Sequence, residues 1–348
     1  MAAVLAAVMA VAPAGCAGSG DQAGGDPNQV WEEQLFAMDT VMTITAYGPN
    51  GQEAVAEAVA ELERLDALWS AENPDSEVAR INAGNRDLEL SQDTRDLLDR
   101  ALVVCRETDG LFDPTIYPLM TLWGFHTDAP KVPDQEEIDA LLPLVDGTAL
   151  TLEGNALTMG DGQDQGPGWE IDLGGIAKGY ASARVMEIFR RHGVTSGIVS
   201  LGGNVQALGV KPDGSPWRVG VQDPEDENGL VGTLSVEGRA VITSGGYERY
   251  FEENGQRYIH ILDPRTGYPA QSDLDSVTVI SADGALADGL STALYIMGTE
   301  RAIRFWVPRA DQFDLILVTR EGEVWITQGV AQQFSTQWPV RVVEAQGS

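Results

Sequence analysis

Short β-prone runs outnumber the helical segments of this chain, and the two kinds of segment do not alternate regularly along it. Regular alternation of strand and helix would predict a parallel α/β sheet, whereas the irregular order favours an α+β fold with largely antiparallel sheets and packed helices. Residues 31–340 contain no linker rich in proline and glycine, so we expect them to form one compact domain.

Hydrophobic periodicity predicts the main elements. Apolar residues recur every three or four positions between Val55 and Trp69, which is typical of an amphipathic helix. Ser91 is placed to cap a second helix that ends by Gly110, and Cys105 lies on its apolar face, so we expect this cysteine to pack in the core rather than act as a nucleophile. The remaining expected elements are a helix that ends at Gly193, a helix over 285–297, strands at 41–46, 197–201, 217–221, 241–243, 258–262 and 277–280, and a hairpin of 315–318 and 324–327.

The charge balance excludes one class of partner. The chain has 22 Lys and Arg against 53 Asp and Glu, which gives a formal net charge of −31. A surface this acidic repels DNA, RNA and anionic lipid headgroups, so we expect no nucleic-acid binding.

The first residues have the profile of an export signal. Residues 1–14 are almost entirely small and apolar, and the run is shorter than the ~20 residues that a membrane-spanning helix needs. Ala14 and Gly15 directly before Cys16 resemble a bacterial lipobox, so we expect a signal peptide over 1–15 and lipidation of Cys16, with a plain cleaved signal as the alternative. Residues 16–30 are expected to be a flexible tether and 341–348 a C-terminal tail. Together these features predict an exported, membrane-anchored bacterial lipoprotein that faces the periplasm.

Two segments have the residue types that bind phosphate and a hard metal ion. Residues 172–180 place a glycine-rich turn before a predicted helix, where free backbone N–H groups favour phosphate oxygens; a tight helix entry is the alternative. Asp288 and Thr292 are four residues apart and therefore share one helix face. Hard oxygens at this spacing suit Mg²⁺, although Thr292 could instead hydrogen-bond to its own helix.

The sequence has three histidines, and one of them is the best candidate for a general base. His260 directly precedes a turn that collects Asp, Arg and Thr at the end of a predicted strand. His192 has the position of a helix C-terminal cap, and His126 ends an aromatic stretch, so neither position requires a catalytic role.

Eight ordered segments of the chain resemble the ApbE family of bacterial flavin transferases. They are 38–40, 73–76, 112–115 with 123–125, 172–180, 200–204, 243–245, 260–269 and 287–294. The resemblance implies a single ApbE-like domain over 31–340. It also implies a Mg²⁺-dependent enzyme that transfers FMN from FAD to a threonine hydroxyl of exported flavoprotein subunits of membrane redox complexes, with release of AMP.

The resemblance also implies roles for individual residues. The metal ligands would be the Gly175 carbonyl, Asp288 and Thr292, with Ser291 as a neighbour, and the base would be His260. The FAD contacts would be Met38, Leu111, Phe112, Asp113, Asp172, Lys178 and Leu262. These assignments agree with the parts that positioning and charge neutralisation in phosphoryl transfer require.

Three positions depart from the family pattern. Asp39 replaces a frequent glycine, Gly246 replaces a frequent polar residue, and Glu72 stands where many members have an aromatic residue that contacts the flavin. Trp69, Trp123 and Tyr247 are the candidate replacements for that aromatic side chain, and without one we expect weaker FAD binding.

Two other functions stay open at this point. A Mg²⁺-dependent FAD pyrophosphatase would use water in place of the acceptor hydroxyl and would yield free FMN and AMP. A non-catalytic FAD-binding lipoprotein would need neither His260 nor the metal.

Overall fold

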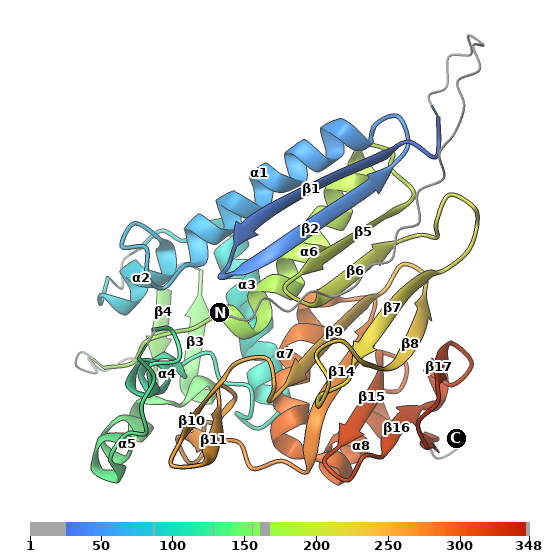
Figure 1. Ribbon diagram of the computed structural model, residues 1–348. Helices are drawn as coiled ribbons and strands as arrows, with labels where there is room; N and C mark the ends of the chain where they lie inside the picture. Colours follow the sequence, from blue (N-terminus) through green and yellow to red (C-terminus); the bar gives the residue numbers. More distant parts are fainter. Residues whose placement is uncertain (1–25, 86–87, 128, 155, 161–167, 346–348) are drawn as a thin grey trace.

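The computed structural model describes residues 26–85, 88–127, 129–154, 156–160 and 168–345. Its centre is a nine-stranded sheet with the strand order β1-β2-β5-β6-β9-β14-β15-β16-β18 (Figure 1). The strands of this sheet are β1 (Val30–Ala37), β2 (Thr40–Tyr47), β5 (Gly197–Leu201), β6 (Asn204–Leu208), β9 (Ala240–Gly245), β14 (Leu274–Ser281), β15 (Phe313–Thr319), β16 (Val324–Thr327) and β18 (Val340–Val343). Only the pairing of β16 with β18 is parallel in this sheet as described. The prediction of an α+β fold with largely antiparallel sheets is therefore confirmed.

Helices cover one face of the large sheet, and a smaller sheet covers part of the other (Figure 1). The helices are α1 (Gly51–Trp69), α2 (Glu77–Asn82), α3 (Gln92–Glu107), α4 (Tyr117–Trp123), α5 (Gln135–Leu141), α6 (Gly174–Arg191), α7 (Gly284–Met297) and α8 (Thr299–Trp306). The smaller sheet has the order β17-β8-β7, with β17 at Phe334–Thr336, β8 at Leu230–Val236 and β7 at Trp217–Gln222. Three hairpins complete the description: β3 (Leu150–Glu153) with β4 (Ala156–Met159), β10 (Tyr250–Glu253) with β11 (Gln256–Ile259), and β12 (Leu262–Asp263) with β13 (Tyr268–Pro269).

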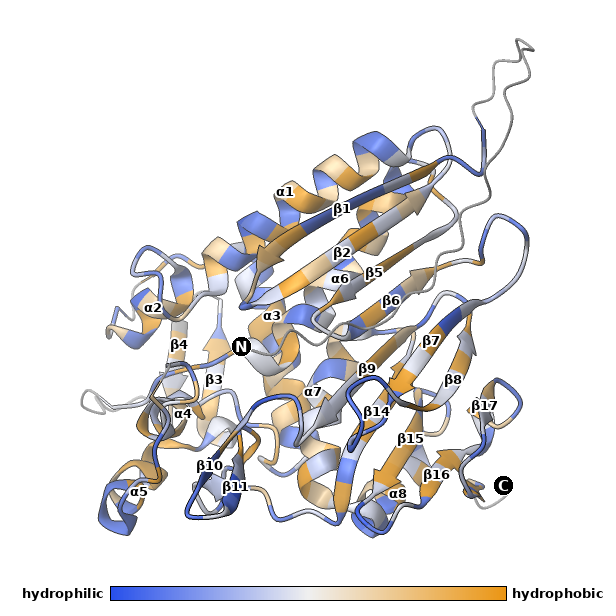
Figure 2. Cartoon of the chain, viewed as in Figure 1, coloured by the Kyte–Doolittle hydropathy of each residue, from blue (hydrophilic) through white to orange (hydrophobic). Residues whose placement is uncertain are grey.

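The main hydrophobic core lies between the large sheet and helices α1, α3, α6, α7 and α8. A second core fills the space between the two sheets, and a third, aromatic cluster joins α4 and α5 to the segment around β12. Figure 2 shows why β1 escapes a pattern-based prediction: the middle of this edge strand is hydrophilic, and most of its side chains are exposed. An edge strand needs no apolar alternation because one partner strand satisfies its backbone.

Most of the predicted helices and strands are confirmed, but one predicted strand is divided in two. Ser91 caps α3 by accepting a hydrogen bond from the Thr94 N–H at 3.3 Å. Cys105 is buried in the core, and burial together with nearby carboxylates raises its pKa to about 12, which confirms its structural role. The strand predicted over 258–262 is wrong, because β11 ends at Ile259 and β12 begins at Leu262. His260 lies between them, where its own backbone N–H donates to the Arg249 carbonyl.

The ends of the sheet lie slightly outside the expected domain boundaries. β1 begins at Val30, and β18 continues to Val343, three residues into the segment expected to be a tail. The expected signal peptide, Cys16 and most of the expected tether lie outside the described residues. In the part of the chain that the structure describes, no helix is long and apolar enough to cross a membrane.

Candidate functional site

The site is built on the crossing of α6 and α7, which pass each other at two glycines. A Cβ on Gly179 would overlap the Gly284 carbonyl and would lie 2.6 Å from the Cβ of Asp288. This close approach lets the backbone N–H of Gly179 donate to Oδ2 of Asp288 at 2.8 Å. Asp288 is therefore fixed on α7 by the backbone of α6.

The three predicted metal ligands lie around this crossing. Thr292 is one turn beyond Asp288 on α7, and its Oγ1 is 3.8 Å from the point that a Cβ on Gly175 would occupy. The Ser291 hydroxyl is fully buried and is used within the protein: it donates to the Asp288 carbonyl and hydrogen-bonds to the Ser244 hydroxyl of β9, both at 2.7 Å. Gly175, Asp288 and Thr292 are thus brought together, while Ser291 ties α7 to the sheet.

The residues at the crossing fit Mg²⁺ that is bound partly by substrate and water, and they fit less well a metal ion whose ligands all come from the protein. Among the described residues no group of three or more His, Cys, Asp or Glu side chains could hold a metal ion. Asp288 is 5% exposed, and burial raises its pKa even though Lys178 and the Gly179 N–H favour its charged form. No basic side chain of the described chain forms an ion pair with Asp288. A cation would offset the cost of burying this carboxylate, and Mg²⁺ needs few protein oxygens when substrate phosphates and waters complete its octahedron.

The start of α6 presents backbone N–H groups beside a lysine. Asp172 accepts a hydrogen bond from the Gly174 N–H at 2.7 Å, and the Lys178 Nζ donates to the Gly174 carbonyl at 3.2 Å. Gly174 is exposed and Gly175 is half-buried. A glycine helix entry of this kind, with a cation beside it, suits phosphate oxygens.

His260 has the protonation state that a general base needs. Its Nδ1 lies 3.0 Å from the Arg249 carbonyl, and a carbonyl can only accept, so Nδ1 carries the proton and Nε2 keeps a lone pair. Burial, together with the charges of Arg249, Lys178 and His126, lowers the pKa of His260 to about 4. The imidazole is therefore neutral at physiological pH.

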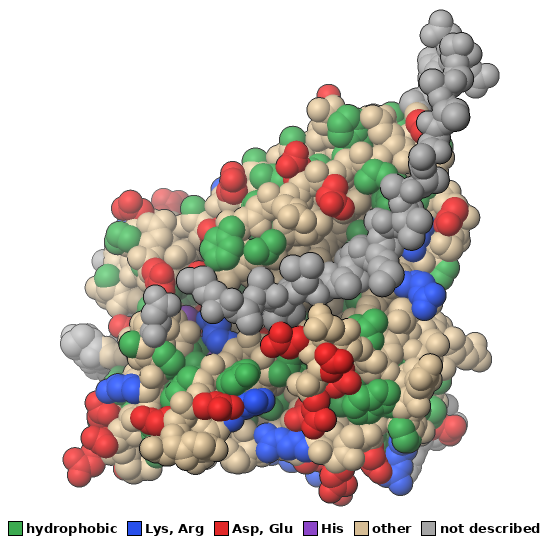
Figure 3. All heavy atoms as spheres, viewed as in Figure 1, with side chains coloured by type: hydrophobic (Ala, Val, Ile, Leu, Met, Phe, Trp, Pro, Cys, Tyr) green, Lys and Arg blue, Asp and Glu red, His purple; other side chains and the backbone are tan. Residues whose placement is uncertain are grey.

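Basic groups gather at this site although the chain as a whole is strongly acidic. Lys178, Arg249 and His126 all act electrostatically on His260. Figure 3 shows a histidine beside Lys and Arg side chains on this face, below the β1–β2 hairpin. These basic groups lie among the carboxylates of Asp172, Glu248 and Asp288, and they can pair with the phosphates of an anionic substrate.

His126 belongs to the site, which its position in the sequence did not require. Its Nε2 lies 3.5 Å from Oδ2 of Asp172, an ion-pair distance, and the nearby Asp172 carboxylate raises the pKa of His126. Burial alone would raise the pKa of Asp172, but His126 and the Gly174 N–H lower it on balance. No local signal in the sequence points to this role, because the partner carboxylate of Asp172 is far away along the chain.

Met38 and Asp39 form the tip of the β1–β2 hairpin, and both have positive φ, of 48° and 58°. A two-residue hairpin turn with two positive φ values is of type I′, where Asn and Gly are favoured. This explains why a glycine is frequent where this chain has Asp39. The Met38 N–H donates to Oδ1 of Asp66 at 2.9 Å, which holds the strained residue in place, and the charge of Asp39 acts on His126.

Of the other predicted FAD contacts, one side chain lies at the site and three are buried in the fold. Phe112 lies against Gly175, 3.1 Å from the point that a Cβ there would occupy. Asp113 is buried and accepts hydrogen bonds from the backbone N–H groups of Thr115 and Gly147, at 2.8 and 2.9 Å. Leu111 and Leu262 are buried in the hydrophobic cores. Phe112 is thus at the site, whereas the Asp113, Leu111 and Leu262 side chains are used by the fold.

The structure accounts for Gly246 and excludes two of the three candidate replacements for an aromatic side chain at position 72. A Cβ on Gly246 would lie 2.8 Å from the Tyr295 hydroxyl oxygen, so a polar side chain has no room there. Trp69 and Trp123, two of the candidate replacements for an aromatic at position 72, are 6% and 0% exposed. Their indole N–H groups donate to the Thr94 hydroxyl and the Gly267 carbonyl, so neither is free to stack on a ligand.

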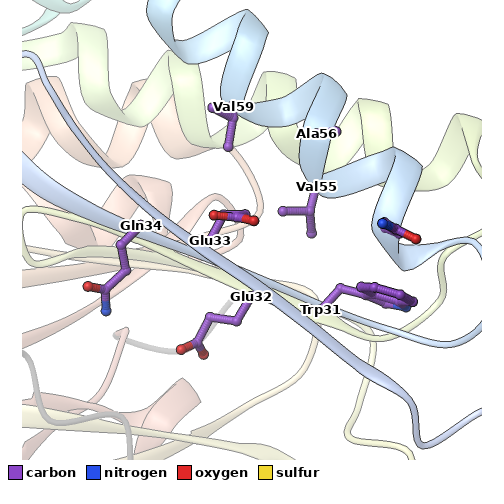
Figure 4. A pocket seen from close by; sticks show the side chains of 8 residues that line it. Trp31, Glu32, Glu33, Gln34, Val55, Ala56 and Val59 are labelled. Carbon is purple, nitrogen blue, oxygen red and sulfur yellow. The ribbon is translucent and has the colours of Figure 1, made fainter.

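A hollow of about 410 Å³ lies elsewhere, between the edge strand β1 and helix α1 (Figure 4). Its lining includes Trp31, Glu33 and Val59, and it contains none of the predicted site residues. One of its carboxylates, Glu32, accepts a hydrogen bond from the Thr45 hydroxyl across the strand pair at 2.9 Å. The candidate chemistry is therefore concentrated at the α6–α7 crossing and not in this hollow.

The chain is similar to known proteins of one kind. A model of the ApbE family matches residues 38–317. An FAD:protein FMN transferase of Klebsiella pneumoniae (strain 342) is 36% identical over 314 residues, which cover 88% of this chain and 95% of that relative. The ApbE protein of Thermotoga maritima has a TM-score of 0.80 at 32% identity, covering 88% of this chain and 99% of that one. The flavin transferase ApbE of Vibrio cholerae has a TM-score of 0.75 at 28% identity, covering 90% and 98%.

Proposed function

The chain belongs to the ApbE family, and from this membership and the geometry of the site we infer that it is an FAD:protein FMN transferase. The observation that carries this function is the meeting of three parts at one place. These parts are a glycine helix entry for phosphate, an oxygen-bearing face of α7, and a neutral histidine with one free ring nitrogen. Lys178 links them, because its charge acts on both Asp288 and His260. Phosphoryl transfer requires positioning, charge neutralisation and a proton acceptor, which these parts can supply.

We propose that the acceptor is a threonine hydroxyl of an exported flavoprotein and that His260 takes its proton at Nε2. The hydroxyl oxygen then attacks the phosphorus on the FMN side of the pyrophosphate. The bond from that phosphorus to the bridging oxygen breaks, and AMP leaves with the electron pair. The start of α6 and Lys178 hold the pyrophosphate oxygens in this proposal, because they present donors and positive charge.

Gly175, Asp288 and Thr292 are the residues that would hold Mg²⁺. A bound Mg²⁺ would neutralise developing charge on the phosphate oxygens, as in other phosphoryl transfers. The support for this proposal is a buried carboxylate without a basic partner, next to a hydroxyl and the glycine helix entry.

The test is to incubate the protein with FAD, Mg²⁺ and a candidate acceptor, and to measure AMP release together with the intact mass of the acceptor. An FMN transferase releases AMP in step with covalent flavin on the acceptor. A pyrophosphatase would release AMP at the same rate with or without acceptor, and a flavin carrier would release none. Acceptor-independent AMP with no labelled protein would contradict the transferase.

The lowered pKa of His260 predicts an unusual pH profile. Because the imidazole stays neutral down to about pH 4, the titration of His260 itself should lower kcat/KM for transfer little between pH 7 and 5. A histidine with an ordinary pKa of about 6.5 would lose most of its base form over this range. The measurement is kcat/KM against pH at saturating Mg²⁺ for the wild type and for His126→Gln, in which position 126 cannot titrate. A midpoint near 6.5 in both enzymes would contradict the structure around His260.

We propose export and lipid anchoring through Cys16, on the strength of the apolar run and the small residues before it. The periplasmic side would then give the enzyme access to exported acceptor subunits of membrane redox complexes. Cys16→Ser should release the protein from membranes into the soluble fraction, while the transferase activity stays unchanged. The check is membrane fractionation with N-terminal mass spectrometry, and a mature N-terminus at any residue other than a lipid-modified Cys16 would refute this proposal.

A further inference from the structure

Tyr117 and His126 form an aromatic pair at the site that no role yet explains. Tyr117 is the first residue of α4, and His126 follows the end of that helix by three residues. Their ring centroids are 5.7 Å apart with an interplanar angle of 33°, and both residues are half-buried. The pair thus joins the two ends of α4 on the side of the site.

This pair stands apart from the other aromatic side chains nearby. Trp123, Phe125, Phe251, Tyr258 and Tyr268 contact one another in a closed cluster. Among the ring pairs of the described residues, Tyr117 and His126 contact only each other. The rings of Tyr117 and His126 therefore do not pack in the aromatic cluster.

The pair is connected to the phosphate end of the site by a short path. Nε2 of His126 is buried, has no hydrogen-bond partner in the described part of the chain, and lies 3.5 Å from Oδ2 of Asp172. The other oxygen of Asp172 accepts from the Gly174 N–H at the start of α6. A ligand that lies on the two rings can therefore reach the glycine helix entry with its phosphates.

We propose that Tyr117 and His126 form a platform on which the isoalloxazine ring of FAD stacks. The proposal rests on the inferred FMN transferase function, because it assigns the ring of that enzyme's substrate. It also offers an aromatic surface where this chain has Glu72, because Trp69 and Trp123, two of the three candidate replacements, are closed in the core.

The charges around Tyr117 favour isoalloxazine over adenine, the other ring of FAD. Besides burial, the charges of Asp172, Glu170 and Glu72 raise the pKa of Tyr117, so its phenol lies in a negative environment. The face of a phenol ring carries the negative part of its quadrupole. Isoalloxazine is the more electron-poor of the two ring systems and is therefore the better partner for this face.

The test compares Tyr117→Leu, which keeps apolar volume without a π face, with Tyr117→Phe, which keeps the ring. Binding is measured by titration of the purified protein with FAD, with FMN and with AMP, in the presence of Mg²⁺. We expect Tyr117→Leu to weaken FAD and FMN binding about three- to tenfold and to leave AMP binding unchanged, because aromatic stacking contributes on that scale. Quenching of the flavin fluorescence on binding should decrease in Tyr117→Leu and persist in Tyr117→Phe.

The matched control is Tyr47→Leu, since Tyr47 also packs against one other ring, that of Trp217, but far from the site. Thermal unfolding of each variant separates a lost contact from a damaged fold. Unchanged FMN binding in a folded Tyr117→Leu would overturn the platform, and weaker AMP binding would overturn the isoalloxazine assignment. If the wild-type protein bound FAD without transferring FMN, the inferred function would fail while the platform would stand.

Discussion

Replacing His260 by alanine is expected to lower FMN transfer by roughly 10²–10⁴-fold, the usual contribution of a positioned general base. A protonated threonine hydroxyl is a poor nucleophile, and Nε2 of His260 is the ring nitrogen with an available lone pair. FAD binding should change little, because in the proposed site the start of α6 and the metal ligands, not the imidazole, would hold the pyrophosphate. The measurement is AMP release and covalent flavin on the acceptor, at equal protein concentration for both enzymes.

The control for this experiment is His192→Ala. His192 pairs with Glu57 at 2.6 Å on the C-terminal end of α6, away from the crossing with α7, and its removal should leave transfer unchanged. Equal transfer by wild type and His260→Ala would remove His260 from the mechanism. A loss of FAD affinity as large as the loss of rate would instead make it a substrate-positioning residue.

Asp288→Asn should remove Mg²⁺-dependent transfer, with a loss of about 10²–10³-fold. Asparagine keeps an oxygen that can accept from the Gly179 N–H, so the helix crossing is preserved while the negative charge is lost. Asp288→Ala should lose activity equally but should also destabilise the fold by about 1–3 kcal/mol, because the buried N–H is left without a partner. Thr292→Val should weaken activity less than either change at Asp288.

The readout is the transfer rate against Mg²⁺ concentration, together with thermal unfolding. Asp283→Asn is the matched carboxylate control, since Asp283 caps the same helix α7 and pairs with Arg100 outside the site. It should leave the Mg²⁺ dependence intact, and EDTA should act on the wild type as Asp288→Asn does. Normal turnover with normal Mg²⁺ dependence in Asp288→Asn would show that the proposed metal site is wrong.

Local pattern was enough to predict the elements whose burial is one-sided. Helix α1 has its apolar residues on one stripe, and α3 has a side-chain cap, so both were found from the sequence. The edge strand β1 was missed because exposure on most of its length removes the alternation that marks a strand. The predicted strand around His260 was wrong because its first part pairs with β10, whereas Leu262 pairs with Pro269 in a second hairpin, and no local signal encodes this change of partner.

The site was predictable where its chemistry lies in one short segment. The four-residue spacing of Asp288 and Thr292 predicts that they share a helix face, and the glycines at 174 and 175 predict the start of a helix. Tyr117 and His126 were missed because they are nine residues apart, and only the fold of α4 brings their rings together. The core roles of Trp69 and Trp123 likewise depend on partners far away in the sequence.

The glycine crossing of α6 and α7 shows which positions of this enzyme tolerate substitution and which do not. Any side chain at Gly179 or Gly284 would force the helices apart and would move Asp288 away from the N–H group that fixes it. The side chains at the hairpin tip and in the ring pair at the ends of α4 are exposed or half-buried, so no helix crossing closes them in. Redesign toward a flavin analogue or a new acceptor sequence should therefore vary Met38, Asp39, Tyr117 and His126. The residues of the helix crossing should stay unchanged.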